Sequence, residues 1–315
     1  MHPVIVIGMH RSGTSLMVKI LEELGVFMGA DQEHNKESIF FIWINKWIMH
    51  QTHASWDNPQ NCRYLSEGAK NTLTPIIKNR LKSYHKKEYF GKVKMRNSFS
   101  GIDFRWGWKD PRNTFTLDVW KEIFDDCKVI HIYRNPVDVA ESLIQREKKI
   151  RTNIGNLTGT GIKKKLFSLR LPKKNFFMQS FRCLDYSGCF SLWKEYITQA
   201  FNISNNTSII IHISYEDLIS SPEKVIADLS EFLKLKNNTI VNKNIFNTER
   251  KFAFLNNPEL VDFYHQIQED EIVKKLNYGN LINEEAISSN LPHWIHNSTI
   301  LSERTGYYLE KDIKR

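Results

Sequence analysis

The chain has 315 residues and a formal net charge of +9 at pH 7. That length can bury a large core, either as one α/β domain or as two smaller domains. The longest apolar runs are only a few residues, so we expect no transmembrane helix. The first residues, Met-His-Pro before a strand-like run, lack the charged and apolar regions of a secretory signal, and we expect a cytoplasmic protein.

The cysteines and the basic charge limit the classes of ligand and partner. The four cysteines form no CxxC pair and no Cys/His ligand cluster, so we expect reduced thiols and no metal site. A basic chain suits nucleic acid, an anionic membrane or a small anionic ligand, but lysines can also serve only to keep a protein in solution. The positions of the basic residues therefore have to decide among these classes.

Strand and helix patterns alternate along the chain. The first strand, Val4–Gly8, precedes a helix that carries Leu16, Ile20 and Leu24 on one face. Residues 51–100 show no clear pattern. The later expected strands are Trp106–Lys109, Lys128–Tyr133 and Ser208–Ile213, and the other expected helices are Phe40–Met49, Thr114–Phe124, Pro136–Lys148, Ser191–Phe201 and Pro222–Leu235.

This alternation predicts an α/β fold with a central parallel sheet flanked by helices on both faces. The loops at the carboxyl ends of such strands form the ligand crevice. Four polar segments lie at these ends: Met9–Ser15, Lys109–Arg112, Arg134–Asn135 and Tyr215–Asp217. Four such segments at equivalent places indicate a binding site more strongly than any one of them.

We expect residues 1–235 to form the α/β domain. Within it, residues 151–182 interrupt the pattern with the basic stretch GIKKKLFSLRLPKKNFF, which either caps the crevice or is a solvated excursion. Residues 236–315 are expected to be a mostly helical extension that packs on the same domain. This extension either closes the side of the crevice where a second substrate would enter or mediates a homodimer.

The loop after the first strand has the glycine spacing of a phosphate-binding loop. Gly8 and Gly13 match G-x-x-x-x-G-K-[ST], but Thr14 takes the lysine position, Ser15 follows it, and Arg11 supplies a cation within the loop. Amide groups at a helix start bind anions, and arginine suits phosphate or sulfate oxygens. The loop therefore predicts a site for a short 5′-anion, and its alternative is an ordinary strand-to-helix turn without a ligand.

A second anion site is predicted after the strand Lys128–Tyr133. Arg134 leaves the strand end, and Ser142 and Arg146 are four residues apart on one helix face. Two anion sites at neighbouring strand ends suit a nucleotide with phosphates at both ends. In isolation, Arg134 could equally be a charged helix-start residue and Arg146 a surface residue.

Together these segments resemble the sulfotransferases that use 3′-phosphoadenosine 5′-phosphosulfate (PAPS), in particular the bacterial carbohydrate-type and tyrosylprotein branch. The resemblance rests on four motifs in the expected order, HRSGTSL at 10–16, WKDPR at 108–112, RNPVDVAES at 134–142 and SYEDLISSP at 214–222. It implies a three-layer P-loop-type fold and sulfuryl transfer without a required metal. It also accounts for the missing lysine, because PAPS carries one 5′-phosphate and one sulfate instead of a magnesium-bound triphosphate.

The resemblance also implies roles for residues. The 5′ end of PAPS would be held by the loop residues Arg11, Ser12, Gly13, Thr14 and Ser15, and its 3′-phosphate by Arg134, Ser142 and Arg146. Arg11 would also be catalytic, because it would receive the negative charge that grows on the leaving phosphate. Tyr215 would lie near the nucleotide. Lys109 would touch the transferring sulfuryl group or the bridging oxygen, unless it only pairs with Asp110. The product is adenosine 3′,5′-bisphosphate.

The proton of an acceptor hydroxyl needs a general base. In the bacterial branch a catalytic glutamate often follows an aromatic pair, but that place holds Phe41 here. Glu37 is the first candidate and His34 the second, and both could instead be helix-start residues. The acceptor implied by the resemblance is a carbohydrate or glycoconjugate hydroxyl, and its alternative is a peptidyl tyrosine, which the expected cytoplasmic location disfavours. The basic segment 163–174 could bring the protein to an anionic glycan or to a membrane surface.

Two other functions compete with sulfuryl transfer. A small-molecule P-loop kinase or NTPase is supported by the Gly8–Gly13 spacing, but Thr14 in the lysine position and the lack of a convincing magnesium-binding aspartate after a strand count against it. A nucleic-acid-binding protein would explain the basic charge. It would not explain four ordered polar segments at strand ends, so we expect no nucleic acid partner.

Overall fold

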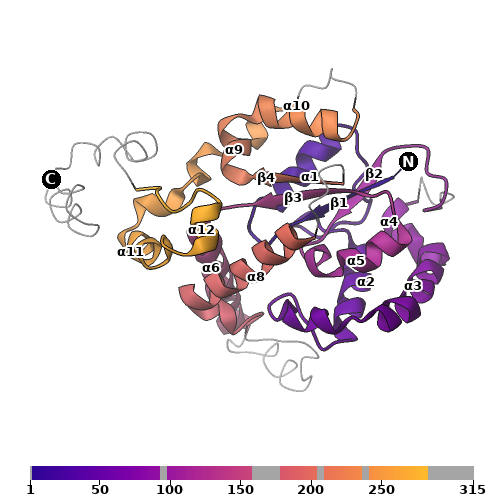
Figure 1. The fold of residues 1–315 in the computed structure, drawn as a ribbon, viewed down its shortest axis with the longest axis horizontal. Coiled ribbons are helices and arrows are strands. Elements are labelled where there is room, and N and C mark those ends of the chain that lie inside the picture. The colour runs from indigo at the N-terminus through magenta and orange to yellow at the C-terminus, as the bar shows by residue number, and fades with distance from the viewer. Residues whose placement is uncertain (1, 93–97, 158–177, 204–208, 236–240, 283–315) are drawn as a thin grey trace, which may run out of the picture. The chain divides into compact units, whose positions relative to one another are not determined.

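The computed structural model describes residues 2–92, 98–157, 178–203, 209–235 and 241–282 (Figure 1). Contacts divide the chain into two units, Met1–Arg134 with Glu195–Lys251, and Asn135–Lys194 with Phe252–Arg315. The predicted domain boundary after residue 235 stays a prediction. The basic segment 163–174 lies outside the described residues.

A parallel sheet forms the centre of the first unit. Its four strands are in the order β2-β1-β3-β4, and every pairing between them is parallel. Their bounds are β1 Pro3–Ile7, β2 Trp106–Lys109, β3 Lys128–Tyr133 and β4 Ile210–Ser214. The predicted α/β class with a central parallel sheet is therefore confirmed.

Helices cover both faces of this sheet, because alternate residues of a strand point to opposite faces. Ile5 and Ile7 of β1 join one apolar cluster with α2, α3, α4 and α5, and Val4 and Val6 join a second cluster with α1, α9 and α10 (Figure 1). The helices are α1 Thr14–Glu23, α2 Ile39–His50, α3 Glu67–Lys82, α4 Lys87–Phe90, α5 Asn113–Ile123, α9 Tyr215–Ser220 and α10 Pro222–Phe232. The result is the predicted three-layer arrangement.

The unassigned stretch 51–100 contains helix α3. Its start is capped by the Ser66 hydroxyl, which accepts a hydrogen bond from the Ala69 amide at 3.3 Å. Leu73, Ile77 and Leu81 recur every four residues and are buried. Pro75 lies inside the helix and removes one backbone donor, and a proline at such a place in a sequence normally argues against a helix. Short 3₁₀ turns, η1 Pro59–Tyr64 and η2 Tyr84–Lys86, flank the helix.

The second unit is helical. Helix α6 runs over Pro136–Leu157, longer than the expected Pro136–Lys148, because no glycine or proline follows until Gly155. Asn135 caps it, accepting from the Asp138 amide at 2.9 Å. The other elements are η3 Arg182–Leu184, η6 Ala253–Asn256, α11 Pro258–Ile267 and α12 Glu271–Lys275, and α8 Tyr186–Asn202 has residues in both units. Among the described helices, none is long and apolar enough to span a membrane.

Candidate active site

The loop between β1 and α1 has a backbone that depends on its glycines. Gly8 has φ 131°, and a Cβ there would lie 2.2 Å from the Ile132 carbonyl oxygen. Gly13 has φ 94°, and its Cβ would lie 2.6 Å from the Tyr215 ring. Arg11 itself adopts φ 72°, a left-handed conformation that costs a non-glycine residue free energy. The loop is therefore held in an unusual shape that brings backbone close to its neighbours.

The start of α1 is open to an anion. Gly13 is its N-cap, no side chain caps it, and its first turn carries no acidic residue. The hydroxyl of Ser12 is buried and has no hydrogen-bond partner among the described residues. Helix N-termini favour negative charge through their amides and their dipole. The loop thus offers backbone amides and the Ser12 hydroxyl as donors to an anion.

Lys109, at the end of β2, and Ser15, just after the loop, both donate to the carbonyl oxygen of Asn35. The Lys109 Nζ donates to the Asn35 carbonyl oxygen at 2.7 Å, and the Ser15 hydroxyl donates to the same oxygen at 2.6 Å. Lys109 is only 1% exposed. Burial lowers the pKa of its ammonium, and the nearby Glu37 carboxylate opposes that shift.

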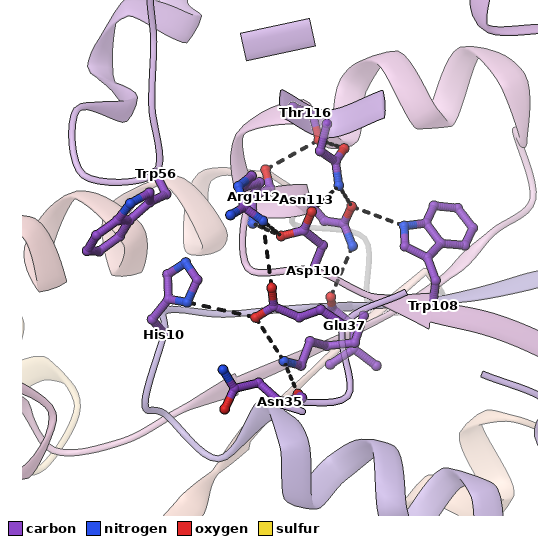
Figure 2. Close-up of polar contacts among 12 residues, drawn as sticks. His10, Asn35, Glu37, Trp56, Trp108, Asp110, Arg112, Asn113 and Thr116 are labelled. Atoms are coloured by element: carbon purple, nitrogen blue, oxygen red, sulfur yellow. Dashed lines mark hydrogen bonds and ion pairs between the residues drawn. The ribbon is translucent and has the colours of Figure 1, made fainter. Parts of the chain in front are cut away.

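Glu37 lies among basic side chains, of which Figure 2 labels His10 and Arg112. Its Oε1 is 3.2 Å from Lys109 Nζ, its Oε2 is 3.7 Å from Arg112 Nη1, and His10 Nδ1 is 3.9 Å from Oε1. The side chain is buried. His34 is exposed on the preceding turn. The structure therefore brings Glu37, and not His34, into contact with Lys109, while the identity of the base stays a prediction.

The turn that precedes α2 places Glu37. The Glu33 amide donates to the Glu37 carbonyl at 2.8 Å, and the Ile39 amide donates to the Asp31 carbonyl at 3.1 Å. Ser38 follows as the N-cap of α2. Lys36 in this turn has φ 64° and pairs with Glu22 of α1 at 2.9 Å. The turn that carries Glu37 is thus tied to α1 through Lys36 and continues directly into α2.

A buried polar network behind Glu37 was missed by the sequence analysis. Asp110 pairs with Arg112 at 2.8 Å and not with Lys109, and Asn45 of α2 donates to Asp110 at 2.8 Å. Burial by itself lowers the pKa of Arg112. The charges of Asp110 and Glu37 oppose this effect, and the net result is a raised pKa. A polar Asn45 inside the apolar run FFIWINKWIM was the available signal, because a buried amide needs partners.

The structure places Arg134 and Tyr215 next to the loop. The Arg134 guanidinium lies over the Tyr215 ring at 4.6 Å and also donates to the Arg250 carbonyl. The Tyr215 ring in turn packs against Gly13. Ser142 and Arg146 lie on α6 in the second unit, where Arg146 contacts Glu147 at 3.2 Å. The predicted grouping of these two residues with Arg134 stays a prediction.

Among the described residues, no group of three His, Cys, Asp or Glu side chains could hold a metal ion. The expectation that catalysis needs no metal stays a prediction, since this finding concerns only that part of the chain. The described cysteines are all buried and unlinked.

Comparison with known proteins gives one family. No curated protein sequence is significantly similar to the chain. Similar solved structures include the sulfotransferase domain of the Synechococcus PCC 7002 olefin synthase (15% identity, 92% of this chain and 95% of that chain, TM-score 0.44). Others are the sulfotransferase domain of the curacin biosynthetic pathway (14%, 88% and 98%, TM-score 0.43) and a sulfotransferase from Alicyclobacillus acidocaldarius (15%, 84% and 92%, TM-score 0.43). The model of the sulfotransferase family matches residues 3–238, well over half of the sequence, and the chain therefore belongs to the sulfotransferase family.

Proposed function

We propose that the protein transfers the sulfuryl group of PAPS to an acceptor hydroxyl on a carbohydrate or glycoconjugate. Membership of the family supports sulfuryl transfer. The observation that carries the proposal is the convergence of Ser15 and Lys109 on the Asn35 carbonyl, with Glu37 3.2 Å from Lys109 Nζ. The loop with its uncapped helix start, the buried Lys109 ammonium and the Glu37 carboxylate are thereby adjacent. Sulfuryl transfer needs such an anion site, a cation and a base.

The donor end is supported by the loop and by Arg134. Arg11, the Ser12 hydroxyl and the amides of Gly13, Thr14 and Ser15 would hold the 5′-phosphosulfate. Arg134, which lies over the Tyr215 ring, would hold the 3′-phosphate, and a contribution of Ser142 and Arg146 to the same phosphate stays a prediction. Without a lysine at position 14 the loop suits a short 5′-anion better than a magnesium-bound triphosphate.

The chemistry asked of these residues is positioning and charge stabilisation. PAPS supplies the sulfuryl group and a phosphate leaving group on which negative charge grows. Lys109 donates to that charge from a buried position, where a cation acts more strongly than in water. Glu37, beside it, accepts the proton of the acceptor hydroxyl. Removing one such donor typically costs about 10²- to 10³-fold in kcat.

The acceptor side is supported by Trp56. Its half-buried indole contacts His10 edge-on at 4.9 Å, and His10 adjoins Glu37 (Figure 2). The Tyr196 hydroxyl fixes the Trp56 backbone by donating to its carbonyl at 2.8 Å. An indole beside a general base offers a surface for a sugar ring or for another planar acceptor. Cytoplasmic location, membrane contact through 163–174, homodimerisation and the absence of a nucleic acid partner stay predictions.

Ligand-induced thermal stabilisation tests the donor. Adenosine 3′,5′-bisphosphate at about 100 times its Kd should stabilise the protein by about 2.7 kcal/mol. We expect this shift for the native protein and its loss in Arg134→Ala. A shift with magnesium-ATP and none with the bisphosphate would overturn the proposal in favour of a phosphoryl-transfer enzyme.

Transfer from labelled PAPS tests the acceptor. A panel of glycans, a tyrosine-containing peptide and water alone as acceptor would be compared, with Glu37→Gln as the matched control. We expect glycan sulfation that the Glu37→Gln variant lacks. Labelling of the peptide alone would replace the carbohydrate by a phenolic acceptor.

A further inference from the structure

We infer that Asn45 is a positioning residue for the transfer reaction, acting on Glu37 through Asp110 and Arg112. The inference rests on the proposed function, because it assumes that Glu37 takes the acceptor proton. Asn45 lies on α2 and is fully buried. Its contacts, and not its own chemistry, define the role.

The amide of Asn45 has every hydrogen bond that it can make. Its Nδ2 donates to Asp110 Oδ2 at 2.8 Å and to Asn113 Oδ1 at 2.7 Å. Its Oδ1 accepts from Thr116 Oγ1 at 2.7 Å and from Trp120 Nε1 at 2.8 Å. Two donors and two acceptor sites are the full capacity of an amide. Such a saturated buried network permits only one arrangement of its members.

The orientation of this amide is fixed by groups that can only donate. Trp120 Nε1 is a donor, so Asn45 must turn its oxygen toward α5 and its nitrogen toward Asp110. Trp108 Nε1 donates to Asn113 Oδ1 at 3.1 Å (Figure 2), so Asn113 in turn presents its oxygen to Asn45. A flipped Asn113 would set its amide nitrogen against two donors, Trp108 and Asn45. A flipped Asn45 would set its nitrogen against the Trp120 donor and its oxygen against the Asp110 carboxylate.

Asp110 passes this constraint to Glu37. Its Oδ2 is taken by Asn45, and its Oδ1 accepts from the Arg112 amide at 3.0 Å and from Arg112 Nη1 at 2.8 Å. The same Nη1 lies 3.7 Å from Glu37 Oε2 (Figure 2). Asp110 is fully buried, so its charge must stay paired. A rotation of Asp110 would therefore move Arg112 and change how Glu37 is held.

Helix α2 supplies a second link between Asn45 and Glu37. Glu37 directly precedes Ser38, the N-cap of α2, and Asn45 ties the same helix to Asp110 just after β2. Phe41 stacks on Trp108 with ring centroids 3.9 Å apart, but stacking allows sliding, whereas the amide contacts specify position. Asn45 thus sets the place of α2 relative to Lys109 at the end of β2.

Exchange variants at Asn45 and Asp110 test the inference. Asn45→Asp sets carboxylate against carboxylate, and Asp110→Asn sets amide donors against amide donors. The double exchange restores one donor facing one acceptor. Thr74→Val is the matched control, because Thr74 donates a hydrogen bond to Glu122 at 2.8 Å within the α3–α5 contact and touches none of these residues.

We expect each single exchange to lower kcat by about 10- to 100-fold, as small displacements of reacting groups do, with the Kd for adenosine 3′,5′-bisphosphate unchanged. Thr74→Val should lose stability but keep kcat. The double exchange should recover much of the lost kcat, and it remains decisive if a single variant fails to fold.

The results separate this inference from the proposed function. If the native protein transfers no sulfuryl group from PAPS to glycan, peptide or water, both fall. If it does transfer and the single exchanges lower kcat no more than Thr74→Val, only the role of Asn45 falls. A double exchange that folds but recovers none of the lost kcat overturns that role as well.

Discussion

Replacing Lys109 by methionine separates the contribution of this residue to stability from its contribution to catalysis. Methionine keeps most of the volume of the buried side chain and removes the charge. The Glu37 carboxylate then loses a cation at 3.2 Å while it stays buried. Breaking a buried pair in this way costs about 3 to 5 kcal/mol, and Arg112 at 3.7 Å from Glu37 places the expected loss at the low end.

The same variant should lose catalysis by a different route. Without a cation near the leaving group, kcat should fall by about 10²- to 10³-fold, while the Kd for adenosine 3′,5′-bisphosphate changes little. Adding Glu37→Gln to Lys109→Met removes the buried unpaired charge. The double variant should therefore regain the stability that Lys109→Met loses, without regaining activity.

Urea unfolding and PAPS turnover measure the two effects on the same samples. Equal losses of stability in Lys109→Met and in the double variant would refute the account of a buried pair. A Lys109→Met enzyme with native kcat and a raised KM for PAPS would refute the catalytic role, because it would mean that Lys109 binds the ground state as strongly as the transition state.

Three other predictions concern the loop, the ammonium of Lys109 and a histidine pair. Gly13→Ala should destabilise the protein and abolish the thermal shift with bisphosphate, since its Cβ would lie 2.6 Å from the Tyr215 ring; a native-sized shift would contradict this. Burial lowers the pKa of Lys109 from 10.5, so as the pH rises kcat/KM should begin to decrease at a pH below 10.5. Lys109→Arg should shift this decrease to higher pH. Burial, with His212 adding to it, lowers the pKa of His131, whose Nδ1 lies 2.9 Å from His212 Nδ1, so the unfolded chain binds protons first as pH drops below about 6.5. The free energy of unfolding should then decrease as the pH decreases, by up to about 1.4 kcal/mol per pH unit for His131. Urea unfolding at several pH values should show a smaller pH dependence for His131→Phe than for the native protein.

Much of the fold follows from local patterns in the sequence. The strands Trp106–Lys109 and Lys128–Tyr133 lie where the pattern predicts, because aromatic and β-branched runs favour buried strands. Of the predicted apolar face of α1, Ile20 and Leu24 are buried and Leu16 packs against the same apolar cluster. Met17, Val18 and Leu21 are fully buried as well, so the apolar face is wider than the three predicted residues.

The site divides between what the local sequence predicts and what depends on tertiary structure. The glycines and the uncapped start of α1 are local features, and the loop could be predicted from them. The contacts of Glu37 depend on a turn in which Lys36 adopts φ 64° and on the place of α2 beside β2. Asn45 was not singled out, since all its partners are distant in the sequence. Arg112 lies two residues from its partner Asp110, but only the folded chain brings it to Glu37.

The charges of this site are better explained by chemistry than by stability. Glu37, Lys109, Asp110 and Arg112 are all buried, beside an aromatic core in which Phe41 stacks on Trp108. Apolar side chains of similar volume are often as stabilising as a buried ion pair, or more so. A fold that needed only a firm contact between α2 and β2 could have used leucines here. If the Glu37→Gln, Lys109→Met double variant unfolds at the same urea concentration as the native protein but transfers no sulfuryl group, the pair contributes nothing to the fold, and its role is catalytic.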